Sequence, residues 1–169
     1  MDTVEQNFAI ELKHITKTFG PVVANDDISL SVKQGEILAL LGENGSGKTT
    51  LMNMLSGIYH PDSGTIYVRG ERRTIASPHD ALSLGIGMIH QHFKLVDVLT
   101  AAENIILGLS GREVLDMKAV SAKINELTAK YGFELDPDQK IYTMSVSQKQ
   151  TVEIVKLLYR GVDLSLIHI

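Results

Sequence analysis

The sequence predicts an α/β fold in which a strand-rich first half is followed by a helical insert. Residues 8–14 and 28–32 alternate apolar and polar side chains, as half-buried antiparallel strands do. From about Asp97 the apolar residues recur instead at steps of three and four, which is the period of a helix. Inside the first half, a glycine-rich turn joins an apolar run to a helix. These observations favour an α/β core that carries a helical subdomain.

The other elements of the first half follow from local signals. The apolar run Glu36–Leu41 predicts a buried strand, and Thr50–Leu55 predicts a helix that ends at Gly57. A cluster of turn residues at 59–64 then leads into a strand at Thr65–Arg69.

A short helix and a further strand complete this half. Ser77 is the expected N-cap of the helix, with Pro78 at its first position and Asp80 three residues after the cap. Gly85 ends the helix, and Ile86–His90 is the next expected strand.

The helical insert is expected to hold three helices, at Thr100–Leu107, at Met117–Tyr131 and from Ser145 to Gly161. The long middle helix has one apolar stripe, made by Met117, Val120, Ile124, Leu127 and Tyr131. We therefore divide the chain into a core at 1–96, a helical subdomain at 97–160 and the stub of another strand at 161–169.

The glycine-rich turn, Gly42–Thr49, fits the pattern G-x-x-x-x-G-K-[ST] of a phosphate-binding loop, or P-loop. Its glycines let successive backbone N–H groups point at phosphate oxygens, and the helix N-terminus adds positive charge. Lys48 is expected to bridge the phosphates, and the hydroxyl of Thr49 to hold Mg²⁺. The turn therefore predicts nucleotide binding.

Composition limits the other classes of function. The chain has 169 residues, 44% hydrophobic and 21% charged, with no cysteine and a net charge of −4. This is the composition of one globular domain without disulfides or thiolate metal sites. The acidic balance argues against broad nucleic-acid binding. The basic cluster Arg69, Arg72 and Arg73 surrounds an expected turn and is interpreted as a solvated hairpin.

Three further motifs, taken with the P-loop, resemble the ATP-binding subunit of an ABC transporter over nearly the whole chain. Phe19 matches the aromatic residue that stacks on adenine in that family, and Gln91 matches the glutamine that ligates Mg²⁺ or orients water. Residues 145–148, Ser-Val-Ser-Gln, occupy the position of the family's signature motif, which binds the γ-phosphate of ATP held by a second domain. His90 and His92 flank Gln91, but no third or fourth ligand lies nearby in the sequence, so we do not interpret them as a metal site.

The resemblance implies ATP and Mg²⁺ as cofactors, with Lys48 and Gln91 in catalysis and Thr49 and Gln91 at the metal. The residues expected to bind the nucleotide are Phe19, Gly42, Glu43, Asn44, Gly45, Ser46, Gly47, Lys48, Thr49, Thr50, Ser145, Val146, Ser147 and Gln148.

The sequence departs from the family pattern at two places. Ser147 stands where the signature motif usually has glycine, and its side chain can crowd the approach of the backbone to phosphate. His168 and Ile169 fall where the family has the aspartate that binds Mg²⁺ through water and the glutamate that activates water. The expected fold is thus a P-loop NTPase (ABC ATPase) core with an antiparallel β subdomain and helical insert, C-terminally truncated. Either the chain is a natural, degenerate ATP-binding module, or, as we favour, the gene model is incomplete and Leu164–Ile169 is an artefact of its end.

The amino-acid sequence of residues 85–97 and 103–108 is similar to that of the first ATP-binding half of bacterial importers for nucleosides and simple sugars. This implies permease membrane subunits and a second ATP-binding domain as partners, with a substrate-binding protein acting indirectly and no nucleic acid. It also implies a peripheral position on the cytoplasmic face of the plasma membrane. The alternatives are a soluble ABC ATPase acting on ribosomes or DNA and, less favoured, a small-molecule phosphotransferase, which usually has an arginine-rich lid.

In this family the acidic strand lies beside the strand before the P-loop, so a chain without it exposes an apolar edge. We therefore expect these 169 residues, expressed alone, to give a low soluble yield or to aggregate. Size-exclusion chromatography and a thermal melt test this expectation, and a purified monomer with a sharp, reversible melt would contradict it.

Overall fold

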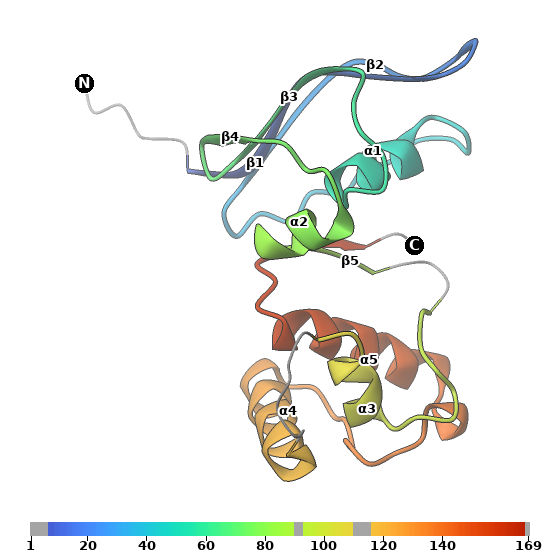
Figure 1. Cartoon of the computed structure of the whole chain (residues 1–169), viewed down its shortest axis with the longest axis vertical. Helices are drawn as coiled ribbons and strands as arrows, with labels where there is room; N and C mark the ends of the chain where they lie inside the picture. Colours follow the sequence, from blue (N-terminus) through green and yellow to red (C-terminus); the bar gives the residue numbers. More distant parts are fainter. Residues whose placement is uncertain (1–6, 90–92, 110–115, 168–169) are drawn as a thin grey trace. The chain divides into compact units, whose positions relative to one another are not determined.

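The computed structural model describes residues 7–89, 93–109 and 116–167, and the chain divides into two compact units, Met1–Ile86 and Gly87–Ile169 (Figure 1). Each unit has its own set of buried apolar side chains. The core and helical-subdomain ranges expected from the sequence, which meet at residues 96 and 97, stay a prediction.

The first unit contains a four-stranded antiparallel sheet in the order β2-β1-β3-β4 (Figure 1). Its strands are β1 (Phe8–Phe19), β2 (Val22–Lys33), β3 (Ser63–Val68) and β4 (Glu71–Arg73). The three strands expected from the sequence at 8–14, 28–32 and 65–69 are thereby confirmed, and the first two are longer than expected. Arg69 and Gly70, with φ of 51° and 79°, form the tight turn between β3 and β4, which confirms the hairpin in the basic cluster.

A bulge explains how β1 keeps one apolar face over its length. Ile10, Leu12 and Ile15 are all buried, although the step from Leu12 to Ile15 is three residues instead of two. The register with β2 shifts between these two residues, and His14 has a φ of 55°. An extra residue in one strand turns the following side chains by one position, so Ile15 returns to the core face.

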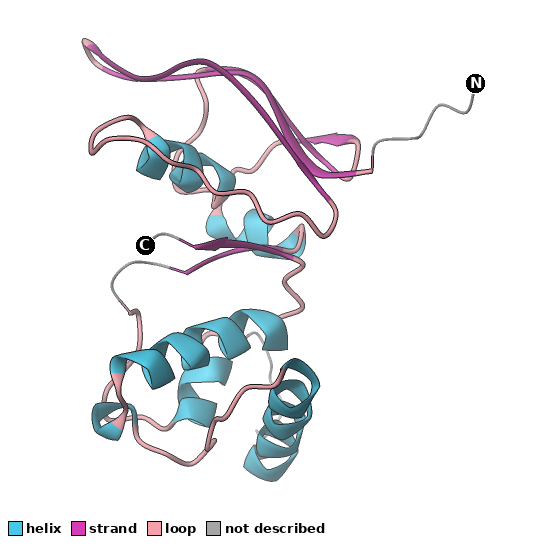
Figure 2. Ribbon diagram, turned by 180° about the vertical axis from the view of Figure 1, so that it is seen from behind, coloured by secondary structure: helices cyan, strands magenta, loops and turns pink. Residues whose placement is uncertain are grey.

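Two helices, α1 (Lys48–Leu55) and α2 (Pro78–Ser83), lie on the same side of this sheet (Figure 1, Figure 2). Both confirm the sequence expectation, and the Ser77 hydroxyl accepts a hydrogen bond from the Asp80 N–H as the predicted N-cap. Gly57 follows α1 with a φ of 75°, and a Cβ there would lie 2.3 Å from the carbonyl oxygen of Ser77. Glycine is therefore needed where the chain after α1 passes the start of α2.

The strand predicted at Glu36–Leu41 is wrong. The structure assigns no regular element to these residues, and the side chains of Ile37 and Leu41 are 97% and 88% exposed. A strand forms only where a neighbour supplies a ladder of hydrogen bonds. Among the described residues, none of the strands pairs with 36–41, so an apolar run alone does not produce one.

The second unit combines a two-stranded sheet with a group of helices. The sheet pairs β5 (Ile86–Ile89) with β6 (Leu164–Ile167). The helices are α3 (Ala101–Ile106), α4 (Met117–Tyr131), the 3-10 turn η1 (Ile141–Thr143) and α5 (Val146–Tyr159). All three α-helices confirm the sequence expectation, and α3 and α5 each begin with a complete capping box, Thr100 with Glu103 and Ser145 with Gln148.

Apolar side chains from these helices, together with Met144 just after η1, form one core. Its buried members are Ala101, Ala102, Ile105, Ile106, Val120, Ile124, Ile141, Met144, Val152 and Val155. The stripe predicted for α4 is buried at Val120 and Ile124 but not at its ends, where Met117 and Tyr131 are 36% and 48% exposed. Thr128 is buried instead, four residues after Ile124 on the same helix face.

The segment before α3 is held by a buried amide. Asn104 is 0% exposed; its Oδ1 accepts from the Val96 N–H at 2.7 Å, and its Nδ2 donates to the carbonyl oxygens of Val96 and Thr100 at 3.1 and 2.9 Å. Backbone bonds from Ala101 to Gln139 and from Ile141 to Leu99 then bring residues 97–102 beside residues 137–142.

Replacing Asn104 with leucine should lower the free energy of unfolding by about 1–3 kcal/mol, because the backbone groups of Val96 and Thr100 lose partners inside the protein. Urea denaturation followed by circular dichroism measures the change. Asn125→Leu on the exposed face of α4 is the control and should have little effect. Equal effects of the two substitutions would show that the amide of Asn104 does not hold this segment.

Candidate nucleotide-binding site

The P-loop connects residue 42 to the first turn of α1, and Lys48 closes it. The Nζ of Lys48 donates to the carbonyl oxygens of Gly42 and Glu43, both at 2.7 Å, and to the Ser46 hydroxyl at 3.3 Å. These bonds hold the ammonium group over the loop, where it can meet an anion. The structure thus brings together four of the residues predicted to bind phosphate.

Two glycines give the loop its path. Gly45 and Gly47 have φ of 87° and 84°, a region that side chains with a Cβ rarely adopt. Gly47 is in addition tightly enclosed, because a Cβ there would lie 2.2 Å from the carbonyl oxygen of Ala24. The loop therefore passes so close to β2 that only glycine fits at position 47.

Asn25 on β2 is a second contact to this part of the loop. Its side chain is buried, and its Nδ2 donates to the Gly47 carbonyl oxygen at 3.3 Å. Its Oδ1 is buried without a hydrogen-bond partner among the described residues. Asn25 was not predicted from the sequence. The signal that could have found it is a polar residue on β2 at a position that faces inward.

The start of α1 suits an anion. The helix begins at Lys48 with Gly47 as its N-cap, a residue that has no side chain to cap the helix, and the first turn contains no acidic residue. Helix N-termini carry partial positive charge and donate N–H groups to phosphates. Thr49 and Thr50, predicted to bind Mg²⁺ and nucleotide, lie in this first turn. The N–H groups of this turn suit the oxygens of a polyphosphate chain, and a threonine hydroxyl oxygen is a ligand of the kind that Mg²⁺ takes.

An aromatic pair lies at the end of β1. The rings of Phe19 and Tyr59 meet edge-on, with centroids 5.2 Å apart and planes at 70°, and the Lys17 Nζ lies 5.4 Å from the Phe19 centroid. Phe19 is 42% exposed and Tyr59 is 36% exposed, so both rings retain surface on which a flat base can stack. Tyr59 was not predicted, because the sequence interpretation treated residues 59–64 only as a turn.

The carboxyl of Asp62, which is held by residues next to Phe19, has a lowered pKa. The hydrogen bond from the Lys17 side chain, followed by those from the backbone N–H and hydroxyl of Thr18, lowers the pKa of the Asp62 carboxyl from 3.8 to about 2. The pKa of this carboxyl is thus lower in the folded chain than in the unfolded chain. Asp62 therefore stabilises the fold above pH 3.8, and this contribution is lost as the pH falls toward 2.

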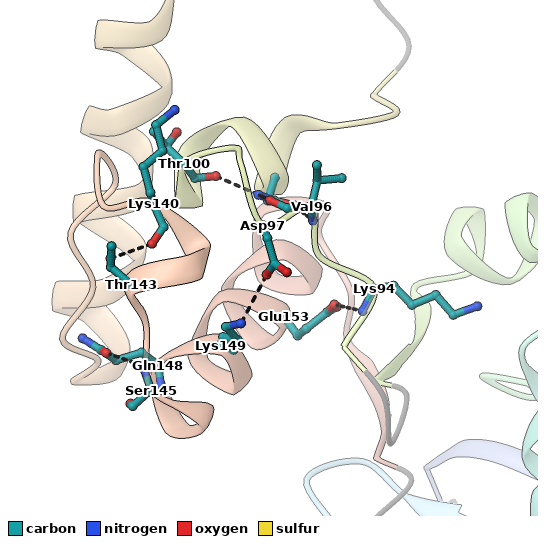
Figure 3. Close-up of polar contacts among 11 residues, drawn as sticks. Lys94, Val96, Asp97, Thr100, Lys140, Thr143, Ser145, Gln148, Lys149 and Glu153 are labelled. Carbon is teal, nitrogen blue, oxygen red and sulfur yellow. Dashed lines mark hydrogen bonds and ion pairs between the residues drawn. The ribbon is translucent and has the colours of Figure 1, made fainter.

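The signature residues lie in the second unit, at the start of α5. The Ser145 hydroxyl accepts from the Gln148 N–H at 3.3 Å, and the Gln148 Oε1 accepts from the Ser145 N–H at 2.9 Å (Figure 3). Val146 is 72% exposed and Ser147 is also exposed. The N-terminus of this helix of 14 residues, with exposed residues at its first two positions, suits an anion brought by another molecule.

Two side chains of α5 hold the segment that follows Gln91. The buried Glu153 accepts from the Lys94 N–H at 2.9 Å, and the Lys149 Nζ lies 3.2 Å from Asp97 (Figure 3). Neither role was predicted, although Glu153 was visible as a carboxylate between the apolar residues of a helix. Gln91 itself, with His90, His92, His168 and Ile169, lies outside the described residues.

The described ranges, 7–89, 93–109 and 116–167, contain no group of three or more His, Cys, Asp or Glu side chains arranged to hold a metal ion. No helix in the same ranges is long and apolar enough to cross a bilayer.

Comparison with known proteins gives consistent results. The nucleoside import ATP-binding protein NupA of Lactococcus lactis is 52% identical over 160 residues, and the guanosine import ATP-binding protein NupO of Bacillus subtilis is 50% identical over 159. These matches cover 92% and 93% of this chain but 31% of each relative, so the chain spans about a third of their length. The ADP conformation of an ATP-binding cassette from an ABC transporter superposes with a TM-score of 0.78 at 25% identity, over 94% of this chain and 67% of that one.

The fold and the P-loop together define an ATP-binding cassette, a class of P-loop protein in which an antiparallel sheet and a helical part accompany the nucleotide-binding loop. The family model of ABC transporters matches residues 25–167, and the chain belongs to this family. The resemblance drawn from Phe19, Gln91 and residues 145–148 is thereby confirmed at the level of the family, as is the α/β cassette fold.

Alanine at Gly47 should destabilise the chain more than alanine at Gly45. Both substitutions force a side chain into a left-handed conformation, at about 1–2 kcal/mol each. Only the Cβ at position 47 also meets Ala24, which should add about 1–3 kcal/mol. Urea unfolding of the two variants measures the difference, and equal losses would contradict the close approach of the loop to β2.

Proposed function

We propose that this chain is the ATP-binding part of a subunit that powers the import of a nucleoside or simple sugar through an ABC permease. The single observation that carries the proposal is the closed P-loop, in which Lys48 Nζ bonds to the carbonyl oxygens of Gly42 and Glu43 at the N-terminus of α1. The names of the relatives at about 50% identity support a nucleoside as the solute.

Each residue has a defined part in binding ATP. Lys48 and the backbone N–H groups of residues 42–50 bind the phosphates, because an ammonium group and converging amides neutralise their charge. The Phe19 ring stacks on adenine. Thr49 and Gln91 hold Mg²⁺, which supplies further charge neutralisation between the phosphate groups.

The signature residues 145–148 act on a second nucleotide. In our proposal they bind the γ-phosphate of ATP held by another ATP-binding domain, so that two domains close around the ligand. This closure drives permease subunits on the cytoplasmic face of the plasma membrane, and a substrate-binding protein delivers the solute to those subunits. The rival function, a soluble ABC ATPase on ribosomes or DNA, is not favoured, because both relatives described above are named for import.

Replacing Lys48 with alanine should weaken ATP binding by about 30-fold or more, because the phosphates lose their charged partner and the loop loses the bonds that close it. Equilibrium dialysis with labelled ATP and Mg²⁺ measures the dissociation constant. Lys118→Ala, at an exposed lysine of α4, is the matched control and should leave it unchanged.

Two results would reject the proposal. One is a folded wild-type chain that takes up no labelled ATP at millimolar concentration. The other concerns transport: in the complete subunit with its permease, Lys48→Ala should abolish ATP-dependent uptake of labelled nucleoside, and unchanged uptake would exclude the import role.

A further inference from the structure

The segment between α1 and β3, residues 56–62, connects the phosphate-binding helix to the aromatic ring of Phe19. We propose that Asp62 and Tyr59 in this segment are positioning residues, which fix the Phe19 ring relative to α1 so that one nucleotide can reach both. The inference rests on the proposed function, since it takes Phe19 as the base-stacking ring.

Asp62 attaches the segment to the end of β1 through four hydrogen bonds. Its carboxylate accepts from the Lys17 Nζ at 2.7 Å, the Thr18 N–H at 2.7 Å and the Thr18 hydroxyl at 2.8 Å. Its own N–H donates to the Thr16 carbonyl oxygen at 2.9 Å. The bond to the Thr18 N–H matters most here, because it fixes the backbone immediately before Phe19.

Tyr59 makes the second attachment, and it does so on the ring itself. Its ring meets the Phe19 ring edge-on at 5.2 Å, an arrangement that aromatic pairs prefer. The backbone of this residue is in turn held to α1, since the N–H groups of Ile58 and Tyr59 both donate to the Asn53 carbonyl oxygen, at 2.8 and 3.1 Å. A continuous set of contacts therefore runs from α1 through Tyr59 to Phe19.

The position of Phe19 relative to α1 matters because base and phosphates belong to one ligand. In the proposed function the first turn of α1 donates to phosphate. Its last turn anchors the segment that holds the ring. With eight residues, α1 is a rigid spacer about 12 Å long. A ring that moves freely would have to be ordered each time a nucleotide binds, which weakens the stacking interaction.

Because the Asp62 side chain is partly exposed, its contacts are expected to position Phe19 more than they stabilise the whole fold. The Asp62 side chain is 42% exposed, and exposed ion pairs contribute little to folding. The hydrogen bonds of Asp62 go to residues 16–18 at the end of β1, whereas Lys48 holds the P-loop through Gly42 and Glu43. Loss of the Asp62 carboxylate should therefore affect the base and spare the phosphates.

The test compares the binding of ATP with that of inorganic tripolyphosphate, which has no base. Asp62→Asn and Tyr59→Leu should each raise the dissociation constant of ATP by about fivefold, the lower end of the loss of a base–aromatic stack. The dissociation constant of tripolyphosphate should stay within about twofold. Glu126→Gln, which removes a carboxylate from the exposed face of α4, is the matched control for charge and should change neither constant.

Phe19→Ala serves as the reference for loss of the stack, and calorimetry measures both ligands on the same samples. ATP binding unchanged in Asp62→Asn and Tyr59→Leu overturns the positioning role alone. Equal weakening of ATP and tripolyphosphate also overturns it, since that result indicates general damage to the fold. A wild-type chain that binds neither ligand overturns the proposed function, and with it this inference.

Discussion

The ammonium group of Lys48 is the interaction on which the candidate site depends. Its bonds to the carbonyl oxygens of Gly42 and Glu43 bring the two ends of the loop together at the start of α1. The backbone can follow this path only because Gly45 and Gly47 adopt positive φ, and because Gly47 leaves room for Ala24. The motif thus specifies a geometry as well as a charge, so its spacing in the sequence is enough to predict a loop of this shape.

Helices and hairpins were predictable because the groups that define them are near in sequence. The capping boxes of α3 and α5 join residues three apart, and the turn at Arg69 and Gly70 needs only its own backbone angles. The strand expected at Glu36–Leu41 failed for the opposite reason. Its hydrogen bonds must come from strands distant in the sequence, and no described strand supplies them. Periodicity reports which residues favour burial, but it does not report whether a partner is present.

The residues that sequence reasoning missed are mostly polar groups that satisfy backbone atoms. Asn104 and Glu153 hold residues 94–100, Asp62 holds Thr18, and Asn25 contacts Gly47. Buried backbone groups must find partners, so an irregular segment depends on such side chains for its shape. A single sequence shows that a carboxylate or amide is present, but not which distant N–H it will meet. Such residues therefore become visible only in the fold.

The residues proposed to bind one ATP and those proposed to act on a second ATP lie in different units of the chain. Phe19, Tyr59, Asp62 and the P-loop belong to the first unit, where the base-stacking ring and the phosphate donors are joined through α1. Ser145 and Gln148 begin α5 in the second unit, where Lys149 and Glu153 of the same helix hold residues 94–97. A rigid helix couples its N-terminus to whatever its later turns contact. Movement of residues 94–97 must therefore either shift the start of α5 or break the bonds of Glu153 and Lys149, so this helix links the segment after Gln91 to the signature residues.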